Sequence, residues 1–256
     1  MEGNNTNRFL TYLLEILKLM VESGAEIYRV EESAQHICTA YGMKGVDVYA
    51  TTSNIIVSVE VEEGLIKTHT RRIGRISTDI ERVDRLNSLV RNMSAKHPDL
   101  ETVKEELDKV KDTPAYGTVF TLFFYAMIAA AFYLFFGGRS IVEFVISGVI
   151  GFCVGGISFV LSKIHANNLL AKFICSFFAC MVAYTCCRIG LAGRVDHIII
   201  GNIMALIPGI GLTNSLRDLF IGDSVSGTLR FIEAIMLAIA IACGYIITSL
   251  LFGGGM

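Results

Sequence analysis

The chain has 256 residues, of which 53% are hydrophobic and 18% charged, and its mean hydropathy is +0.56. This composition is too apolar for an ordinary soluble domain and indicates several membrane spans in a lipid bilayer. Residues 1–113 carry 15 Lys and Arg against 19 Asp and Glu, and residues 114–256 carry 7 against 5. Neither part has the basic excess of a nucleic-acid binder, so no nucleic-acid partner is expected.

The fall in charge density divides the chain at Thr113-Pro114, where the proline also ends the preceding helix. We predict an α+β soluble N-terminal domain at residues 1–113. An all-α polytopic membrane domain with five transmembrane helices is expected to follow at residues 114–256. The N-terminus lacks the charged and apolar regions of a signal peptide, so the first domain is expected to be cytoplasmic.

Two amphipathic helices are predicted first. Apolar residues recur at helical spacing over residues 9–20 and again over residues 27–41, and Gly24 between them is a helix stop. On the opposite face of the second helix, three charged residues lie three positions apart: Glu26, Arg29 and Glu32. At that spacing they can pair along a solvated surface.

The period then changes to two, which predicts strands at residues 46–50, 55–62 and 66–71. Residues 62–64 form the turn of the second hairpin. We expect the Glu side chains of one strand to lie opposite Lys and Arg side chains of the other.

Two helices complete the first domain. Thr78 and Glu81 fit a capping box at the start of one of them, and the other begins after Pro98. The resulting 113 residues are enough to form a core of their own.

Residues 1–113 contain no motif of a nucleotide site, a zinc protease or a serine hydrolase, and their histidines are scattered. The seven cysteines include no C-x-x-C pair and are expected to be small apolar fillers. We therefore expect no enzyme activity, no catalytic residue, no cofactor, no metal site and no ATP-driven transport.

Hydropathy predicts spans at residues 117–136, 141–161, 169–189, 198–219 and 228–252, each near the ~20 residues needed to cross a bilayer. With a cytoplasmic first domain, an odd number of spans places the C-terminus outside. The basic residues between the spans give a weak excess on the inner side, in agreement with this orientation.

The second span carries a stripe of small residues, Ser147, Gly151 and Gly155, which allows another helix to approach closely. Glu143 lies one turn earlier on the same stripe. As a carboxylate in the first turn of a helix it is favoured by the helix dipole. A role in moving a proton or a substrate is the alternative.

The fourth span is predicted to be a broken helix. Pro208 leaves the carbonyl of Met204 without its helical partner, and Gly209 lets the backbone bend. Transporters tolerate such a break where it lines a polar cavity. Arg217 could bind a substrate carboxylate, and a buried acid could carry a proton.

The candidate transport path contains Asn202, Pro208, Gly209, Asn214, Arg217, Asp218, Asp223, Glu233 and Glu143. The alternative is that residues 217–223 form an ordinary cytoplasmic connector and that Arg230 pairs with Glu233 one turn further on.

Several short motifs, in one order along almost the whole chain, resemble the threonine/serine exporter family. They are residues 21–26 with 29–32, 52–54, 71–72, 206–209 with Asn214, 217–218, 222–223 and 226–227. The motif residues singled out in the first domain are Gly24, Glu26, Arg29, Glu32, Ser53, Asn54 and Arg71.

The resemblance implies a multi-pass protein of the bacterial inner membrane that exports small hydrophilic amino acids, threonine and serine, by proton-coupled antiport. It also implies a second membrane module, since single-chain members look about twice as long. The chain is similar to the five-span subunit of a two-component exporter whose partner is a small membrane protein. A second copy of this chain is the alternative partner. The split branch has been associated with dicarboxylates, including succinate, which leaves the substrate open.

Two other function classes stay open. A membrane-anchored regulatory protein would sense a metabolite through its first domain. On that hypothesis Asn214→Ala and Arg217→Ala would be silent, whereas changes at Glu26 or Arg29 would not. A membrane-embedded enzyme acting through an acid or histidine of the first domain, Glu26, Glu32 or His69, is the third possibility.

Overall fold

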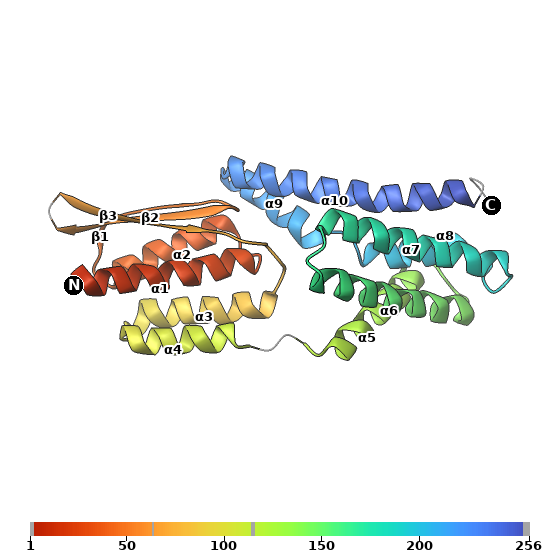
Figure 1. Cartoon of the computed structure of the whole chain (residues 1–256), viewed down its shortest axis with the longest axis horizontal. Helices are drawn as coiled ribbons and strands as arrows, with labels where there is room; N and C mark the ends of the chain where they lie inside the picture. The colour runs from red at the N-terminus through yellow and green to blue at the C-terminus, as the bar shows by residue number, and fades with distance from the viewer. Residues whose placement is uncertain (1–2, 63, 114–115, 253–256) are drawn as a thin grey trace. The chain divides into compact units, whose positions relative to one another are not determined.

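The computed structural model describes residues 3–62, 64–113 and 116–252 (Figure 1). The protein is mostly helical, with one small sheet, and it divides into two compact units. The first unit consists of Met1–Pro114 and Ile210–Phe231, and the second of Ala115–Gly209 and Ile232–Met256. A segment from the predicted membrane domain therefore packs with the N-terminal residues.

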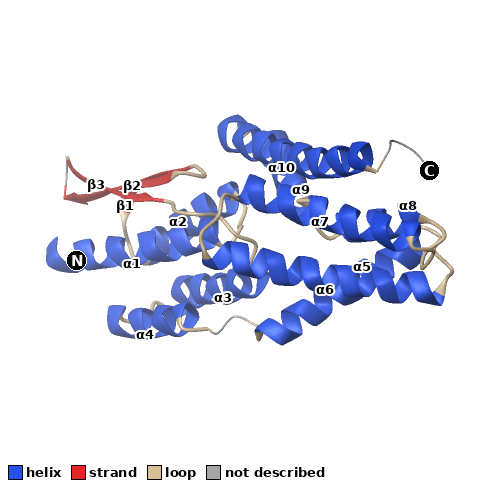
Figure 2. Ribbon diagram, turned by 45° about the vertical axis from the view of Figure 1, so that its right-hand side comes forward, coloured by secondary structure: helices blue, strands red, loops and turns tan. Residues whose placement is uncertain are grey.

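In the N-terminal part of the first unit, two helices precede a three-stranded antiparallel sheet along the chain and two helices follow it. Its N-terminal elements are α1 (Gly3–Glu22), α2 (Ile27–Ala40), β1 (Lys44–Ala50), β2 (Asn54–Glu62), β3 (Leu65–Arg72), α3 (Ile80–Lys96) and α4 (Leu100–Lys111). One face of the sheet packs on α1 and α2, and α3 and α4 cover the other side of these helices (Figures 1 and 2). The apolar face of α1 is therefore enclosed between sheet and helices, and residues such as Leu13 and Leu17 are fully buried.

The hairpin between β2 and β3 has a register that differs from the predicted charge pairing. Glu60 lies opposite Ile66, and Arg71 lies opposite Ile55. Because Ile55 is fully buried, Arg71 is on the sheet face that meets the helices, where it pairs with Glu15 of α1 at 3.5 Å. The expected Glu–Lys/Arg ladder is wrong, since a shift of one residue moves a side chain to the other face.

The start of α3 also differs from the prediction. Its N-cap is Asp79 rather than Thr78, and the Asp79 carboxylate accepts the backbone N–H of Arg82 at 3.0 Å. Asp and Thr are both good N-caps, so the sequence alone left the position ambiguous by one residue.

The C-terminal part of the first unit is a tight helical hairpin. It joins α9 (Gly209–Ile221) to the first turns of α10 (Ser224–Leu251). Gly222 has φ +105°, a conformation suited to glycine, and closes α9. Asp223 then caps α10 by accepting the backbone N–H of Ser226 at 3.2 Å. A Cβ on Gly227 would lie 2.8 Å from the backbone nitrogen of Leu219, so the two helices touch closely.

The second unit contains α5 (Thr118–Phe135), α6 (Ile141–Lys163), α7 (Asn168–Arg188), α8 (Val195–Met204) and the rest of α10. In the described part of the chain, α5, α6, α7 and α10 are long and apolar enough to cross a membrane. The predicted fourth span is two helices, α8 and α9, bent by 55° on either side of Pro208. The break is confirmed, and five spans are reached only if this bent pair counts as one.

Small residues pack α6 and α8 against α5, as the stripe in the second span predicts. A Cβ on Gly151 would lie 2.6 Å from the Cβ of Ala129, and one on Gly201 would lie 2.8 Å from the Ala129 carbonyl. Gly156, beside the stripe, has nothing within 4 Å of its added Cβ. The close contact is therefore specific to one face of α6.

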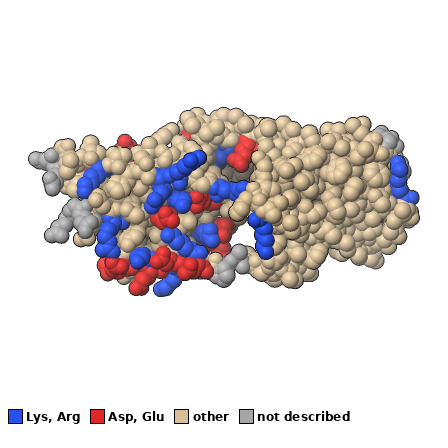
Figure 3. Space-filling view, viewed as in Figure 1, with Lys and Arg blue, Asp and Glu red and all other residues tan. Residues whose placement is uncertain are grey.

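Charged side chains are concentrated on some elements and large exposed apolar side chains on others (Figure 3). On the face drawn, Lys, Arg, Asp and Glu gather over α1–α4 and are sparse over α5–α8. Large apolar side chains on the helices of the second unit are exposed, for example Phe135 at 77% and Ile141 at 81%. Exposed apolar surface on helices of this length is typical of a multi-pass membrane protein.

Candidate functional site

The turn between α1 and α2 exposes a set of carbonyl groups. Gly24, at φ +93°, ends α1 in a Schellman motif: the N–H of Ala25 bonds to the Met20 carbonyl at 2.9 Å and that of Gly24 to the Val21 carbonyl at 3.0 Å. A side chain here would be strained, and its Cβ would lie 3.1 Å from the carbonyl of Ser77. The motif leaves the carbonyls of the turn itself open to other partners.

Three successive residues of this turn each bind one side chain of residues 210–231. The Asn214 amide donates to the Gly24 carbonyl (3.3 Å), the Arg230 guanidinium to the Ala25 carbonyl (2.9 Å), and the Arg217 guanidinium to the Glu26 carboxylate (2.6 Å). We call this set of residues, together with Tyr28, Arg29 and Asp218, the turn cluster. Its members come from two segments of the chain about 190 positions apart, and both segments belong to one compact unit.

A buried ion pair lies within the turn cluster. The Asp218 carboxylate is 3.3 Å from the Arg230 guanidinium, and the exposed fractions of their side chains are 0% and 8%. Charges that are removed from water need a partner, because the cost of desolvation is otherwise not offset. The second carboxylate oxygen of Asp218 has no hydrogen-bond partner among the described residues. Arg230 therefore pairs with Asp218 of α9, a partner twelve positions away that was not predicted from the sequence.

A second, more exposed group of charges surrounds Glu26. One of its oxygens contacts Arg217, and the other lies 3.1 Å from Nε of Arg29. Both guanidinium groups also donate to the phenol oxygen of Tyr28, at 3.1 Å from Arg217 and 3.2 Å from Arg29. Two arginines thus converge on a single carboxylate.

Glu31, one turn further along α2, fixes the end of β1. Its carboxylate accepts the backbone N–H of Ala50 at 2.7 Å. Burial raises the pKa of Glu31, and the nearby negative charges of Asp223 and Asp47 raise it further, against the effect of the Ala50 hydrogen bond.

The second unit contains a buried polar network between three helices. Asn202 of α8, only 1% exposed, donates to the hydroxyl of Ser147 on α6 at 3.2 Å and to the Ile198 carbonyl at 2.9 Å. Ser147 in turn donates to the Ala129 carbonyl of α5 at 3.1 Å. The side-chain oxygen of Asn202 has no partner within the described ranges. Such a residue is expensive in an apolar environment, which favours a functional interpretation.

Glu143 fastens the loop before α8. Its carboxylate accepts the Tyr133 hydroxyl at 2.8 Å and the backbone N–H groups of Gly193 at 2.7 Å and Arg194 at 3.1 Å. It is 7% exposed. Glu143 lies in the first turn of α6, as predicted, and its carboxylate also accepts two backbone N–H groups from the loop before α8.

The structure brings together only part of the predicted set. The members that meet in the turn cluster are Gly24, Glu26, Arg29, Asn214, Arg217 and Asp218. Asn202 and Glu143 lie in the second unit, Pro208 lies in the break between α8 and α9, and Gly209 begins α9.

The other predicted residues have separate surroundings. Asp223 caps α10, and Glu233 is exposed on α10. Glu32 is exposed on α2, and Arg71 pairs with Glu15.

Ser53 lies in the turn before β2 and Asn54 is the first residue of β2; the hydroxyl of Thr51 accepts both of their backbone N–H groups, at 3.3 and 3.1 Å. This arrangement fixes the end of the hairpin between β1 and β2.

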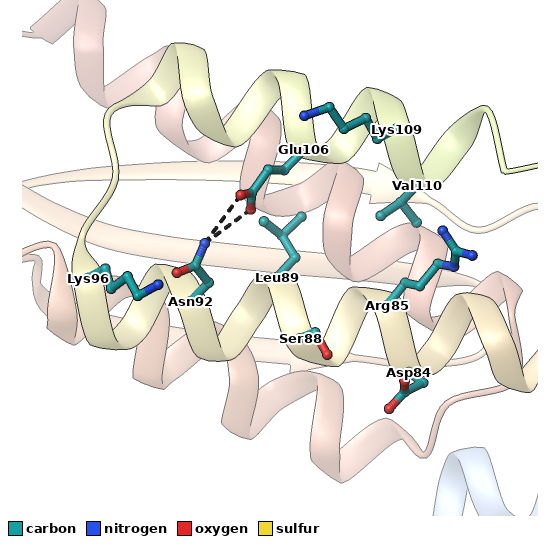
Figure 4. Close-up of a pocket in the computed structure, with 9 residues that line it drawn as sticks. All are labelled: Asp84, Arg85, Ser88, Leu89, Asn92, Lys96, Glu106, Lys109 and Val110. Atoms are coloured by element: carbon teal, nitrogen blue, oxygen red, sulfur yellow. Dashed lines mark hydrogen bonds between the residues drawn. The ribbon is translucent and has the colours of Figure 1, made fainter.

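A groove on α3 and α4 has a volume of about 560 Å³ and contains none of the predicted site residues (Figure 4). The Asn92 amide donates across it to Glu106, with the shorter distance 3.2 Å. Within the described residues, no group of three His, Cys, Asp or Glu side chains is placed to hold a metal ion. The turn cluster and the Asn202 network are therefore the stronger candidates for function.

Comparison with known proteins agrees with the resemblance seen in the motifs. The family model ThrE, described as "Putative threonine/serine exporter", matches residues 11–252. A "Threonine/serine exporter" of Corynebacterium glutamicum is 24% identical over 88% of this chain and 47% of its own length. A "Probable threonine/serine exporter" of Mycobacterium tuberculosis is 23% identical over 95% of this chain and 46% of its own length.

A third relative has a different size. The "Probable succinate transporter subunit YjjP" of Klebsiella aerogenes is 23% identical over 91% of this chain and 90% of its own length. The chain thus spans about half the length of the two exporters but most of this subunit. No solved structure matches the chain significantly. Since the family model covers nearly the whole sequence, the chain belongs to the threonine/serine exporter family.

Proposed function

We propose that the protein is a secondary exporter of small hydrophilic amino acids, threonine and serine, in the bacterial inner membrane. The observation that carries this proposal is the turn cluster. A protein that used its helices only as an anchor would have no need for Asn214, Arg217 and Arg230 to bind three successive residues of one N-terminal turn. In an exporter, such contacts transmit movement between the N-terminal domain and the segment after the broken helix.

The N-terminal domain is cytoplasmic on this proposal, so the turn cluster acts on the side from which substrate enters. The network around Asn202 forms part of the path, because its unpartnered oxygen offers an acceptor to a substrate ammonium or hydroxyl. Pro208 and Gly209 supply the bend beside it.

Protons are the proposed coupling ion. Asp218 supports this role because it is fully buried, lies 3.3 Å from Arg230 and has one unpartnered oxygen that offers a position for a proton. A carboxylate of this kind links protonation to a conformational change.

A dicarboxylate such as succinate is the second candidate substrate. The observation favouring it is that the relative whose printed name contains "succinate transporter subunit" is matched over 90% of its length. The word subunit in that name also supports a second membrane protein as partner, with a second copy of this chain as the alternative.

Efflux measurements test the proposal. Cells that produce the chain together with its small membrane partner should export threonine, serine or succinate faster than cells without the chain. Asn202→Leu should abolish the gain, whereas Phe135→Leu, on an exposed position, should leave it intact. Equal efflux of all three compounds with and without the chain would contradict the proposal.

The same pair of variants separates transport from sensing. Arg217 binds Glu26 directly, so a change at either residue would affect an exporter and a sensor alike. A comparison of Arg217→Ala with changes at Glu26 therefore cannot distinguish the two functions. Asn202 lies in the second unit and makes its hydrogen bonds to side chains and carbonyls of that unit. A pure anchor would tolerate Asn202→Leu without loss of signalling, provided the variant still folds.

A further inference from the structure

We propose that Arg29 and Arg217 form a binding site for a ligand carboxylate, and that Glu26 occupies this site in the structure as an internal competitor. The inference rests on the proposed function, because it names the chemical group of the substrate that the turn cluster would take. Its basis is the convergence of two guanidinium groups on one carboxylate, at 2.6 Å for Arg217 and 3.1 Å for Arg29.

The two arginines are accessible, whereas the acid between them is enclosed. Their side chains are 48% and 53% exposed, and that of Glu26 is 13% exposed. An incoming anion can therefore approach the outer sides of both guanidinium groups. If it displaces Glu26, it gains partners that are already held in place by the phenol oxygen of Tyr28.

The chemistry of the site selects a carboxylate. Guanidinium groups are planar forks that match the two oxygens of a carboxylate and stay charged at all physiological pH values. Threonine, serine and succinate share this group, so the site does not by itself choose among them. It excludes analogues in which the carboxylate is replaced by a neutral amide.

The strength of the contact between Glu26 and the two arginines determines how much ligand affinity changes when the Glu26 charge is removed. A partly exposed ion pair favours the closed form over the open form by a factor of about two to five. Only about one third to one sixth of the molecules then have open arginines, and apparent affinity falls by the same fraction. Removal of the Glu26 charge should therefore tighten binding of a carboxylate by about threefold to sixfold.

Isothermal titration of the purified full-length chain with serine, threonine and succinate at constant ionic strength tests this inference. Glu26→Gln should tighten binding of at least one of the three by about threefold to sixfold. Glu105→Gln removes the same charge from an exposed position of α4 outside the turn cluster and should change nothing. Arg29→Gln or Arg217→Gln, placed on Glu26→Gln, should weaken binding again, and serinamide should not bind.

The proposal is overturned if Glu26→Gln weakens binding, or has the same effect as Glu105→Gln, in protein that elutes as wild type on size exclusion. Binding of serinamide as tight as that of serine would also overturn it, as would the absence of binding by any of the three compounds. Efflux is measured separately. Normal efflux with no change of affinity in Glu26→Gln rejects this site but not the exporter, whereas a change of affinity without efflux rejects the exporter but not the site.

Discussion

Loss of Arg230 should destabilise the protein more than loss of an arginine from a surface ion pair. Arg230→Met would leave the fully buried carboxylate of Asp218 without its partner at 3.3 Å. At that distance and an effective dielectric constant of about 20, the attraction is about 5 kcal/mol. Removal of one member of a buried pair costs about 3–5 kcal/mol, because the other charge stays desolvated. This is a large part of the stability of a domain.

The assay is denaturant unfolding of the purified chain in detergent micelles, followed by the near-ultraviolet circular dichroism of its nine tyrosines. Arg85→Met is the matched control, since Arg85 and Glu81 form a pair with side chains 49% and 40% exposed and should contribute less than about 1 kcal/mol.

The double variant Asp218→Leu/Arg230→Met should be more stable than Arg230→Met, because it leaves no unpaired buried charge. If Arg230→Met costs no more than Arg85→Met, the argument for a buried ion pair is refuted.

Three further predictions concern other contacts. Gly151→Ala should cost about 1–3 kcal/mol of unfolding free energy through overlap with α5, whereas Gly156→Ala should be neutral or slightly stabilising; equal effects would contradict the packing. Glu143→Ala should speed hydrogen–deuterium exchange at the amides of Gly193 and Arg194, and unchanged exchange would exclude the loop contact. Because the folded pKa of Glu31 is raised, its contribution to stability is lost as pH rises through that pKa. Glu31→Gln should therefore gain stability relative to wild type between about pH 4 and pH 7, and a relative loss would contradict the sign.

The sequence predicted those features of the fold that depend on short-range patterns. The helical period over residues 9–20, the strand period after residue 45 and the break at Pro208 each follow from neighbouring residues, and all three agree with the structure. The register of the β2–β3 hairpin could not be predicted in this way, because the alternating charges along the two strands are compatible with two pairings one residue apart. In the structure, Glu60 lies opposite Ile66 and Arg71 lies opposite Ile55.

The contacts of the candidate site required tertiary structure. Asp218 and Arg230 are twelve positions apart on two helices, and the sequence offered Glu233, one turn from Arg230, as the simpler partner. Likewise, no local pattern predicts that the carbonyls of Gly24 and Ala25 bind residues 190 positions or more along the chain.

The polar contacts of the second unit were partly visible in the sequence. Ser147 and Glu143 were found because they lie on one stripe of small residues. Tyr133 was not found, since an aromatic residue in an apolar span carries no sign of its hydrogen bond to a carboxylate.

Reversal of the charges of Glu26 and Arg217 tests most directly the central claim that the turn cluster takes part in export. Efflux of threonine, serine and succinate would be measured in cells with equal membrane amounts of each variant. Glu26→Arg and Arg217→Glu should each reduce efflux, because each leaves two like charges facing one another, and the double reversal should restore part of it. Single reversals that export as fast as the wild type would contradict the account.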